Sequence, residues 1–550
     1  MNLNILKKYS ILLCLALIGV PATQAQETNL PIIPVPQEIK QMSGQLKVSQ
    51  INAIYADANS KNAADFLQKL FKTRYKKNLA IQKAPGAVIV PNAIVITAKA
   101  PSKKGKTEAY KLEVTSQGVK IEGASPAGAF YGVCTLDELC IDPQNGGNAK
   151  TIPAVKIKDG ARFEYRGLMM DVARNFQPVE NVKKFIELMA RYKFNTLHLH
   201  LSDDQGWRIE IKNPKFKKLM TVGAQPNKPE GTRGYYTQKE MKDIIAFAER
   251  HYVDIVPEID MPGHNMGAIT AYPELTCEYV RRVNADPGLL SQNPKMKIEI
   301  WDRAGVSEAL LCAGKKETYE FFDTVLAELT KLFPSKYFHL GGDEAPAKCW
   351  DKCADCNAFM KKEKIKNTQE LMAYFFQRNF EAMAKAGKTA LYWYELDVPN
   401  YPKNAIMYSW RMGLTPRTID RAIKENYKVI CCPGEFAYLD YPQINGDPNH
   451  GWMPVVTLER CYQFDPGYGR PENEQKFILG CEGTLWSEHL VTLDQITYQA
   501  FPRALALAEA GWSPMKNRNW KNFAQRAKPL LQNLKDQGVK TYWPKEVYGE

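Results

Sequence analysis

From about residue 162 onward, short apolar runs alternate with amphipathic helical segments, and this alternation restricts the fold more than any other feature of the chain. The apolar runs are residues 165–172, 194–201, 253–259, 337–340, 390–393, 405–410, 428–432 and 477–486. The helical segments between and after them are residues 179–192, 238–250, 317–333, 369–386, 416–425 and 498–510. Eight strands that alternate with helices predict a closed (β/α)8 TIM barrel. The alternative, an open doubly wound sheet, is disfavoured because no glycine-rich phosphate fingerprint follows the first run.

The region before the barrel has a different pattern, with short β-rich runs and one helical segment. Strands are expected at residues 88–90, 93–97, 110–114 and 119–121, and a helix at residues 63–75. These elements predict a smaller α+β domain over residues 26–160, followed by a catalytic barrel domain over residues 161–550. The smaller domain carries no convincing group of polar residues, so a supporting role is expected for it.

The first 25 residues have the features of a signal peptide. Lys7 and Lys8 precede an apolar run over residues 11–20, and the small residues of the segment 22–25 suit cleavage after Ala25. The run is too short to span a bilayer, and no other segment is long enough. The chain is therefore expected to be exported, to the periplasm or outside the cell, without a membrane span.

The formal net charge of the chain, +13, does not indicate a nucleic-acid partner. The basic residues occur as short pairs between acidic ones, whereas nucleic-acid binding needs a basic stripe or a recognisable module. The charge is interpreted as solvated surface. The sequence leaves the oligomeric state open.

Cysteines and histidines provide two possible metal sites. Cys353 and Cys356 resemble half of a zinc site, but no second CxxC pair or suitably spaced histidine completes it, so a local disulfide or free thiols are favoured. Cys277 and Cys312 are a second candidate disulfide. His198 and His200 alternate along one run, but hydrogen bonding is favoured because they lack a third ligand. No metal or cofactor is expected.

Polar or aromatic side chains follow every one of the eight apolar runs. In a TIM barrel the carboxyl ends of the strands meet at one mouth, where catalytic groups lie. The residues at these ends are Asp171, Arg174, Asp203, Asp204, Glu258, Asp260, His264, Asp343, Glu344, Trp393, Glu395, Trp410, Tyr438, Asp440, Trp486 and Glu488. Their recurrence at all eight ends predicts an active site there.

The adjacent carboxylic acids Asp343 and Glu344 indicate the class of reaction. Hydrolysis of a glycosidic bond needs a proton for the leaving oxygen and a group that meets positive charge at the anomeric carbon. Glu344, beside Asp343 in an aromatic-rich mouth, is expected to have a raised pKa and to act as the acid. Two neighbouring carboxylates cannot easily flank the bond from opposite sides. The pair fits better if one carboxylate serves the leaving group and the other orients a substrate group that attacks internally.

Four segments, residues 166–174, 198–208, 257–264 and 339–344, resemble the family 20 glycoside hydrolases, the β-N-acetylhexosaminidases. The resemblance covers nearly the whole mature chain. It implies exo-acting, retaining removal of terminal N-acetylglucosamine or N-acetylgalactosamine from glycans. The substrate's acetamido oxygen would be the nucleophile and an oxazolinium the intermediate, as in the substrate-assisted exceptions to the two-carboxylate scheme.

The resemblance also implies roles for individual residues. Asp343 would orient the acetamide and stabilise charge on its nitrogen, while Glu344 would protonate the leaving oxygen and then deprotonate water. Asp203 and His264 would form a supporting pair behind Glu344. Trp393, Trp410 and Trp486 would form the walls around the acetamide and the sugar face. Tyr438 would hold the acetamide oxygen through its hydroxyl, and Arg174, Asp440 and Glu488 would bind the ring hydroxyls.

Two alternatives to this function remain at the level of sequence. A catalytically silent glycan-binding protein could use the same barrel, although binding alone does not need the acidic pair Asp343 and Glu344. A relative that releases a disaccharide, or that prefers a sulfated sugar, would keep the acidic pair and change only the surrounding subsites.

Overall fold

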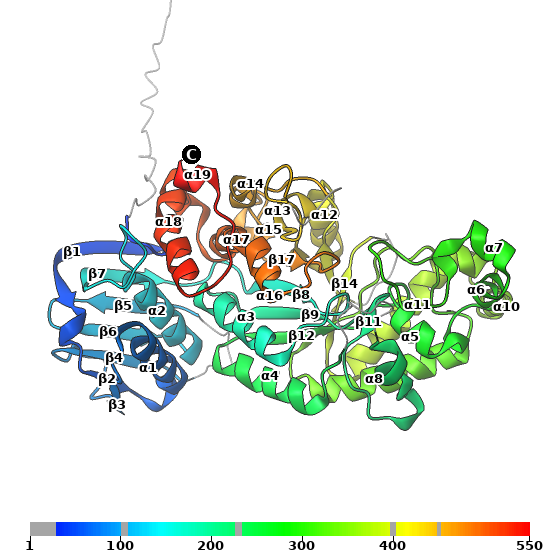
Figure 1. The fold of residues 1–550 in the computed structure, drawn as a ribbon, viewed down its shortest axis with the longest axis horizontal. Coiled ribbons are helices and arrows are strands. Elements are labelled where there is room, and N and C mark those ends of the chain that lie inside the picture. The colour runs from blue at the N-terminus through cyan, green and yellow to red at the C-terminus, as the bar shows by residue number, and fades with distance from the viewer. Residues whose placement is uncertain (1–28, 101–107, 226–233, 396–402, 448–452, 550) are drawn as a thin grey trace, which may run out of the picture.

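The computed structural model describes residues 29–100, 108–225, 234–395, 403–447 and 453–549. A seven-stranded sheet domain is followed by a closed eight-stranded barrel, which confirms the predicted fold class (Figure 1). The proposed signal peptide lies outside the described residues. Within the described ranges no helix is both long and apolar enough to cross a membrane.

The first domain is a mixed sheet with the strand order β1-β7-β5-β6-β4-β2-β3. Its strands are β1 (Glu38–Lys47), β2 (Ala53–Ala56), β3 (Ala80–Lys83), β4 (Ala93–Ala98), β5 (Tyr110–Val114), β6 (Val119–Gly123) and β7 (Thr151–Asp159). The helices α1 (Lys61–Tyr75) and α2 (Pro126–Leu139) pack on the sheet and on each other. The expected strand at residues 88–90 is wrong. Pro85 and Pro91 border this run, and the side chain of Val88 is 50% exposed, so the run has neither a strand partner nor a core to face.

The barrel closes in the order β12-β13-β14-β15-β16-β17-β8-β9, and each pair of neighbouring strands is parallel. Its strands are β8 (Tyr165–Asp171), β9 (Thr196–His200), β12 (Asp254–Glu258), β13 (Tyr337–His339), β14 (Thr389–Trp393), β15 (Ile406–Ser409), β16 (Lys428–Cys431) and β17 (Ile478–Leu485). Each strand falls within or overlaps one of the eight predicted runs. The strands are buried on both faces, as expected for a parallel sheet inside a ring of helices.

The helices between the barrel strands also match the predicted segments, with one exception. The matching helices are α3 (Val179–Arg191), α4 (Gln238–Arg250), α8 (Lys316–Leu332), α11 (Thr368–Lys385) and α12 (Thr415–Glu425). The single helix expected at residues 498–510 is instead two helices, α16 (Leu493–Ala500) and α17 (Arg503–Trp512). The break falls at Phe501-Pro502, because a proline has no backbone N–H to continue the helical hydrogen bonds.

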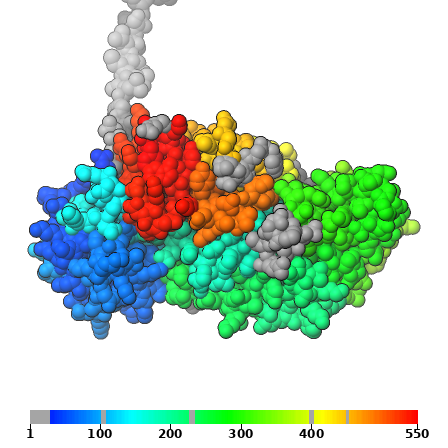
Figure 2. Space-filling view, in the orientation of Figure 1, coloured from blue at the N-terminus to red at the C-terminus, as the bar shows by residue number. Residues whose placement is uncertain are grey.

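Further short elements are inserted into the loops of the barrel. They are β10 (Ser202–Asp203), β11 (Gly206–Trp207), α5 (Met266–Ala271), α6 (Glu278–Ala285), α7 (Pro287–Gln292), α9 (Lys348–Asp351), α10 (Ala354–Glu363), α13 (Gly434–Ala437), α14 (Leu458–Gln463) and α15 (Glu472–Gln475), with α18 (Trp520–Asp536) and α19 (Lys545–Tyr548) after the barrel. The helices α6, α7 and α10 lie at the end of the molecule opposite the sheet domain (Figure 1). The space-filling view shows this end as a continuous green surface (Figure 2).

The sheet domain is joined to the barrel through buried polar contacts. Asp159, the last residue of β7, accepts a hydrogen bond from the indole N–H of Trp512 at 3.0 Å. Arg166, near the start of β8, forms an ion pair of 2.7 Å with Glu108. Both contacts lie near the amino end of β8, so this domain supports the end of the barrel remote from the predicted site residues.

Candidate active site

The barrel places all eleven predicted site residues at or just beyond the carboxyl ends of its strands. In strand order from β8 they are Arg174; Asp203; His264; Asp343 and Glu344; Trp393; Trp410; Tyr438 and Asp440; and Trp486 and Glu488. Parallel strands in a closed ring direct their carboxyl ends to one side. Residues separated by more than 300 positions in sequence therefore come together in one mouth.

The loop after β13 can present two adjacent carboxylates because two glycines precede them. Gly341 and Gly342 have positive φ values of 62° and 107°. A Cβ atom on Gly341 would lie 1.9 Å from Oδ1 of Asp260, and one on Gly342 would lie 2.7 Å from the ring of Phe376. Any other residue would therefore be excluded by both backbone conformation and space. The tight turn carries Asp343, which is buried, and Glu344, whose side chain is 38% exposed.

His264 stands between these carboxylates and a third one. Its Nδ1 lies 3.0 Å from Oδ1 of Asp203, and its Nε2 lies 3.7 Å from Glu344 and 3.9 Å from Asp343. Burial opposes a charge on His264, but the surrounding carboxylates outweigh it and raise the pKa of the imidazole well above its ordinary value. His264 is therefore a cation at neutral pH. It faces the acidic pair with one nitrogen while Asp203 holds the other.

This cation corrects the prediction for Glu344. The sequence predicts a raised pKa, whereas the imidazolium of His264 beside the carboxyl lowers the pKa of Glu344 below its usual value, against a smaller effect of burial. The raised pKa belongs to Asp343 instead: its burial favours the neutral form, although His264 opposes this. The two neighbours thus differ in acidity because one is buried and the other is partly open beside a cation.

Arg174 links the remaining acids of the mouth. Its guanidinium contacts Asp171 at 3.1 Å, Asp203 at 3.0 Å and Glu488 at 3.3 Å, and its centre lies 4.9 Å from the ring centroid of Trp486. Burial would raise the pKa of Asp203, but Arg174 and His264 hold it well below the usual range. The guanidinium therefore keeps Asp203 ionised and fixes Glu488 at the rim.

Three tryptophans and a tyrosine cover the interior of the barrel. The ring centroids of Trp393 and Trp486 are 5.6 Å apart, and Trp410 stacks on Tyr438 at 6.2 Å with an interplanar angle of 18°. Trp393 belongs to the apolar cluster inside the barrel, and Trp410 and Trp486 pack against that cluster from above. Flat rings of this kind bind the apolar faces of ligands well.

Several polar atoms in this mouth are buried without a hydrogen-bond partner among the described residues. They are Oδ1 of Asp343, Oδ1 of Asp440, Nε2 of His264 and Nε1 of Trp410. Buried polar atoms in proteins are almost always paired. These four predicted site residues therefore have donors and acceptors available to a polar ligand.

Four further residues shape the site and were given no role from the sequence. Glu258 accepts a hydrogen bond of 2.7 Å from the indole N–H of Trp393, and Asp260 accepts one of 3.0 Å from the backbone N–H of Gly342. Both stand in the segment 257–264, so their place at a strand end was a signal that they matter. Glu258 orients the tryptophan, and Asp260 holds the turn before Asp343.

The other two residues, Glu395 and Arg411, support Glu344 from the opposite side. Glu395 accepts a hydrogen bond of 3.1 Å from the backbone N–H of Glu344 and pairs with Arg411 at 2.7 Å. Burial and the nearby Asp343 raise the pKa of Glu395 to about 7, against the opposing charge of Arg411. Glu395 follows a predicted run, but nothing in the sequence pointed to Arg411.

The histidines inside the barrel take part in hydrogen bonding, as expected. His198 Nδ1 lies 2.9 Å from Glu482, and His200 Nε2 lies 2.7 Å from Asp203. His339 Nδ1 accepts a hydrogen bond of 3.0 Å from the backbone N–H of Gly341 and lies 2.9 Å from Glu258. His198, Glu258 and His339 are also close enough together to hold a cation. Their contacts with one another form a buried layer under the indole of Trp393.

The candidate disulfide between Cys277 and Cys312 is not formed in the structure. None of the eleven cysteines in the described part of the chain is disulfide-bonded, and all are buried. Cys277 and Cys312 instead lie in one group with Cys353 and Cys356, away from the barrel mouth. The local disulfide within the CxxC segment is likewise not formed.

Comparison with known families gives two adjacent matches. Residues 163–515 match the family described as glycosyl hydrolase family 20, catalytic domain, and residues 29–160 match glycosyl hydrolase family 20, domain 2. A β-hexosaminidase of Akkermansia muciniphila is 40% identical over 425 residues, covering 76% of this chain and 82% of that protein. A β-hexosaminidase of Porphyromonas gingivalis is 34% identical, with coverage of 96% and 67% respectively.

Solved structures show the same similarity. The GH20 exo β-N-acetylglucosaminidase from Vibrio harveyi, in complex with N-acetylglucosamine, superposes with a TM-score of 0.80 at 30% identity and covers 94% of this chain and 79% of that one. A mutant Streptomyces plicatus β-hexosaminidase in complex with its product gives a TM-score of 0.78 at 30% identity, with coverage of 94% and 97%.

Proposed function

The chain belongs to glycosyl hydrolase family 20 and is a glycoside hydrolase of the β-hexosaminidase type, and we propose that it removes terminal N-acetylhexosamine from glycans with the substrate's own acetamide as nucleophile. The β-hexosaminidase activity named for the relatives speaks against the alternative of a catalytically silent binding protein. The observation that carries the proposal is the position of Asp343. Its Oδ1 is buried without a hydrogen-bond partner among the described residues, directly beside the partly exposed Glu344.

In the proposed first step, Asp343 accepts a hydrogen bond from the acetamide N–H and so directs the acetamide oxygen at the anomeric carbon. The oxygen displaces the leaving group, and positive charge develops on the amide nitrogen. Burial disfavours the ionised Asp343 before the reaction. The ionised carboxylate of Asp343 therefore becomes more stable as the cation forms beside it. This interaction stabilises the transition state more than the ground state.

Glu344 serves the leaving oxygen in the same step. It is the more exposed of the two acids, as needed to reach the outgoing group. A substrate that covers the mouth removes water from Glu344, and this favours its protonated, acidic form. After the leaving group departs, the carboxylate of Glu344 is suited to deprotonate the water that opens the oxazolinium, because His264 stabilises its ionised form. Two displacements at the anomeric carbon give retention of configuration.

The terminal sugar is proposed to bind by its hydroxyls to Arg174, Asp440 and Glu488 and by its face to the tryptophans. The unpaired Oδ1 of Asp440 supports this, because a sugar hydroxyl can donate to it. Burial and the nearby Glu488 raise the pKa of Asp440 well above its usual value, which favours the protonated form that can donate a hydrogen bond as well as accept one. Tyr438 would hold the acetamide oxygen from the side of Trp410.

The test compares two substrates that differ only at the second carbon. A 4-nitrophenyl N-acetyl-β-glucosaminide should be hydrolysed with retention, as seen by NMR of the first anomer released, whereas the matching glucoside with a hydroxyl at that carbon should be nearly inert. Equal rates on the two substrates, or release of the inverted anomer, would rule out the internal nucleophile. The corresponding galactosaminide, a chitobioside and a 6-sulfated glucosaminide would then define the preferred sugar.

We further propose that the enzyme acts outside the cytoplasm, as the features of residues 1–25 suggest. Cell fractionation followed by N-terminal sequencing should find the activity outside the cytoplasm, with a chain that begins after Ala25. Activity confined to the cytoplasm, on a chain that keeps Lys7 and Lys8, would contradict this.

A further inference from the structure

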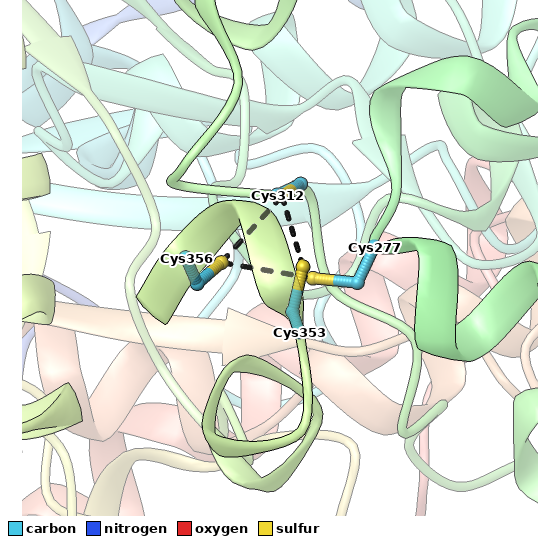
Figure 3. A group of neighbouring side chains, drawn as sticks. All are labelled: Cys277, Cys312, Cys353 and Cys356. Carbon is cyan, nitrogen blue, oxygen red and sulfur yellow. Dashed lines mark hydrogen bonds between the residues drawn. The ribbon is translucent and has the colours of Figure 1, made fainter. Parts of the chain in front are cut away.

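Four cysteines from three separate segments direct their sulfur atoms at a common point (Figure 3). Cys277 precedes α6, Cys312 lies before α8, Cys353 precedes α10 and Cys356 lies in its first turn. All four side chains are 0% exposed, and their sulfurs lie within 4.8 Å of one another. The group is outside the barrel mouth and has no part in the proposed reaction.

The spacing of the sulfurs identifies what the group can bind. The distance is 3.9 Å between Cys277 and Cys356, 3.7 Å between Cys312 and Cys353, and 3.5 Å between Cys312 and Cys356. A disulfide requires about 2.05 Å. Four sulfurs at about 2.3 Å from a tetrahedral zinc ion are separated from one another by about 3.8 Å. We propose that Cys277, Cys312, Cys353 and Cys356 bind one structural Zn²⁺.

The surroundings favour the charge that such a site carries. Four thiolates around Zn²⁺ leave a net charge of −2. Cys277 and Cys353 occupy the N-cap positions of α6 and α10, and neither side chain caps its own helix. The positive ends of two helix dipoles therefore meet the thiolates, which favours negative charge there. Four protein ligands leave no open coordination position, so the ion would be structural and not catalytic.

Cys349 marks the limit of the site. It is buried in α9, four residues before Cys353, but it is not in the group of sulfurs that lie within 4.8 Å of one another. The structure therefore assigns four ligands and leaves Cys349 as a neighbouring thiol.

The ion would join the two loops that carry the catalytic groups. Cys277 and Cys312 lie in the long segment after β12, which also contains His264, whereas Cys353 and Cys356 follow Glu344 in the segment after β13. Next to Cys312, the backbone N–H of Leu311 donates to the carbonyl of Pro262 at 3.0 Å. The carbonyl of Leu311 accepts from the indole N–H of Trp350, also at 3.0 Å. The site thus fixes both loops a few residues from His264 and Glu344.

The first experiment measures metal in the wild-type enzyme, purified without chelator or added metal. Mass spectrometry of the elements should find one zinc per chain, and X-ray absorption at the zinc edge should show four sulfurs at about 2.3 Å. A mercurial that modifies the thiols should release the zinc in step with modification. Iron in place of zinc, or less than about a tenth of a zinc per chain, would overturn the proposal.

The oxidation state of the sulfurs distinguishes the zinc site from the remaining explanation, a pair of disulfides. In the denatured wild-type chain without reductant, the four cysteines should react as thiols once zinc is removed. If they are unreactive and the intact mass shows two disulfides, the group is a pair of disulfides and the proposal fails. If they react but hold no zinc, even after refolding with excess zinc, it fails as well.

Variants then locate the site. Cys356→Ser should lose the zinc and lower Tm, and Cys461→Ser is the matched control, because Cys461 is equally buried but lies on α14. The control should keep one zinc per chain. Since Cys356→Ser can fail to fold, the cobalt-substituted wild type gives an independent readout. It should show the intense sulfur-to-cobalt absorption of a tetrahedral thiolate site, and its absence would contradict the assignment.

Discussion

Nε2 of His264 lies 3.7 Å from Oε2 of Glu344, and both residues have positive φ values, of 50° and 48°. Such backbone conformations are uncommon for residues other than glycine and gather at functional sites. Here they bring a cationic imidazole from one loop against a carboxylate from the next. The reactivity of Glu344 is therefore set by a residue 80 positions away in sequence.

Replacement of Glu344 by Gln should lower kcat/KM on an N-acetyl-β-glucosaminide with a poor leaving group by about 10²- to 10⁴-fold, the usual contribution of a general acid. The loss should be much smaller for a leaving group that needs no proton, and azide should restore turnover in Glu344→Ala with such a substrate. The exposed Glu459→Gln is the control and should match the wild type. A loss below about tenfold on the poor leaving group would contradict the role as acid.

Asp343→Asn should also lower kcat, by about 10²- to 10³-fold, because an uncharged side chain cannot stabilise the cation that forms on the acetamide. In contrast with Glu344→Ala, neither a better leaving group nor azide should restore the rate. Kinetics of the two variants on the same pair of substrates provide the measurement. Rescue of Asp343→Asn by azide would show that Glu344 is not the residue with the acid/base role.

His264→Gln should change the pH profile as well as the rate. The cation lowers the pKa of Glu344, so its removal should raise that pKa and move the basic limb of kcat/KM, which reports loss of the acid's proton, to higher pH. A loss of up to about 100-fold in kcat is expected from misplacement of Glu344. A variant that is slower but has an unchanged pH profile would show that His264 acts only through packing.

The contribution of Glu395 to the stability of the folded enzyme should decrease as the pH rises from weakly acidic to neutral. Its pKa in the folded enzyme is about 7, above the value of about 4.3 expected in the unfolded chain. A group with a raised folded pKa contributes stability that is complete below the unfolded pKa and is lost as pH rises through the folded pKa. The difference in Tm between Glu395→Gln and the wild type should therefore shift in favour of the variant from pH 4 to pH 8. A constant difference would contradict the raised pKa.

Gly341→Ala should damage both stability and catalysis, since the new Cβ would lie 1.9 Å from Oδ1 of Asp260 and the backbone has a positive φ. Gly387→Ala is a matched control with a similar φ of 72° but nothing within 4 Å of the added Cβ. The control should lose only about 1 kcal/mol of unfolding free energy. Equal losses in the two variants, measured by denaturant titration with kcat/KM, would show that contact with Asp260 is unimportant.

The fold could be predicted from the sequence because its signals are local. A strand buried on both faces is a short apolar run, and an amphipathic helix repeats its apolar residues every three to four positions. The eight apolar runs therefore predicted the barrel, and the geometry of a barrel predicted that the residues after these runs meet at one mouth. Local signals failed where a proline interrupts an apolar pattern: at Pro502, which divides one expected helix, and at Pro91, which ends a run with no partner strand.

The sequence by itself determined which residues lie in the mouth, because every parallel strand points its carboxyl end the same way and these residues follow the strands. Their ionisation was decided only by the tertiary structure. The pKa of a carboxyl depends on distances to charges in space, and the imidazole of His264 reversed the direction expected for Glu344. The same reason applies to the four cysteines. Cys312 and Cys353 are 41 positions apart in sequence, so no spacing rule joins them, yet packing of the loops brings their sulfurs within 3.7 Å.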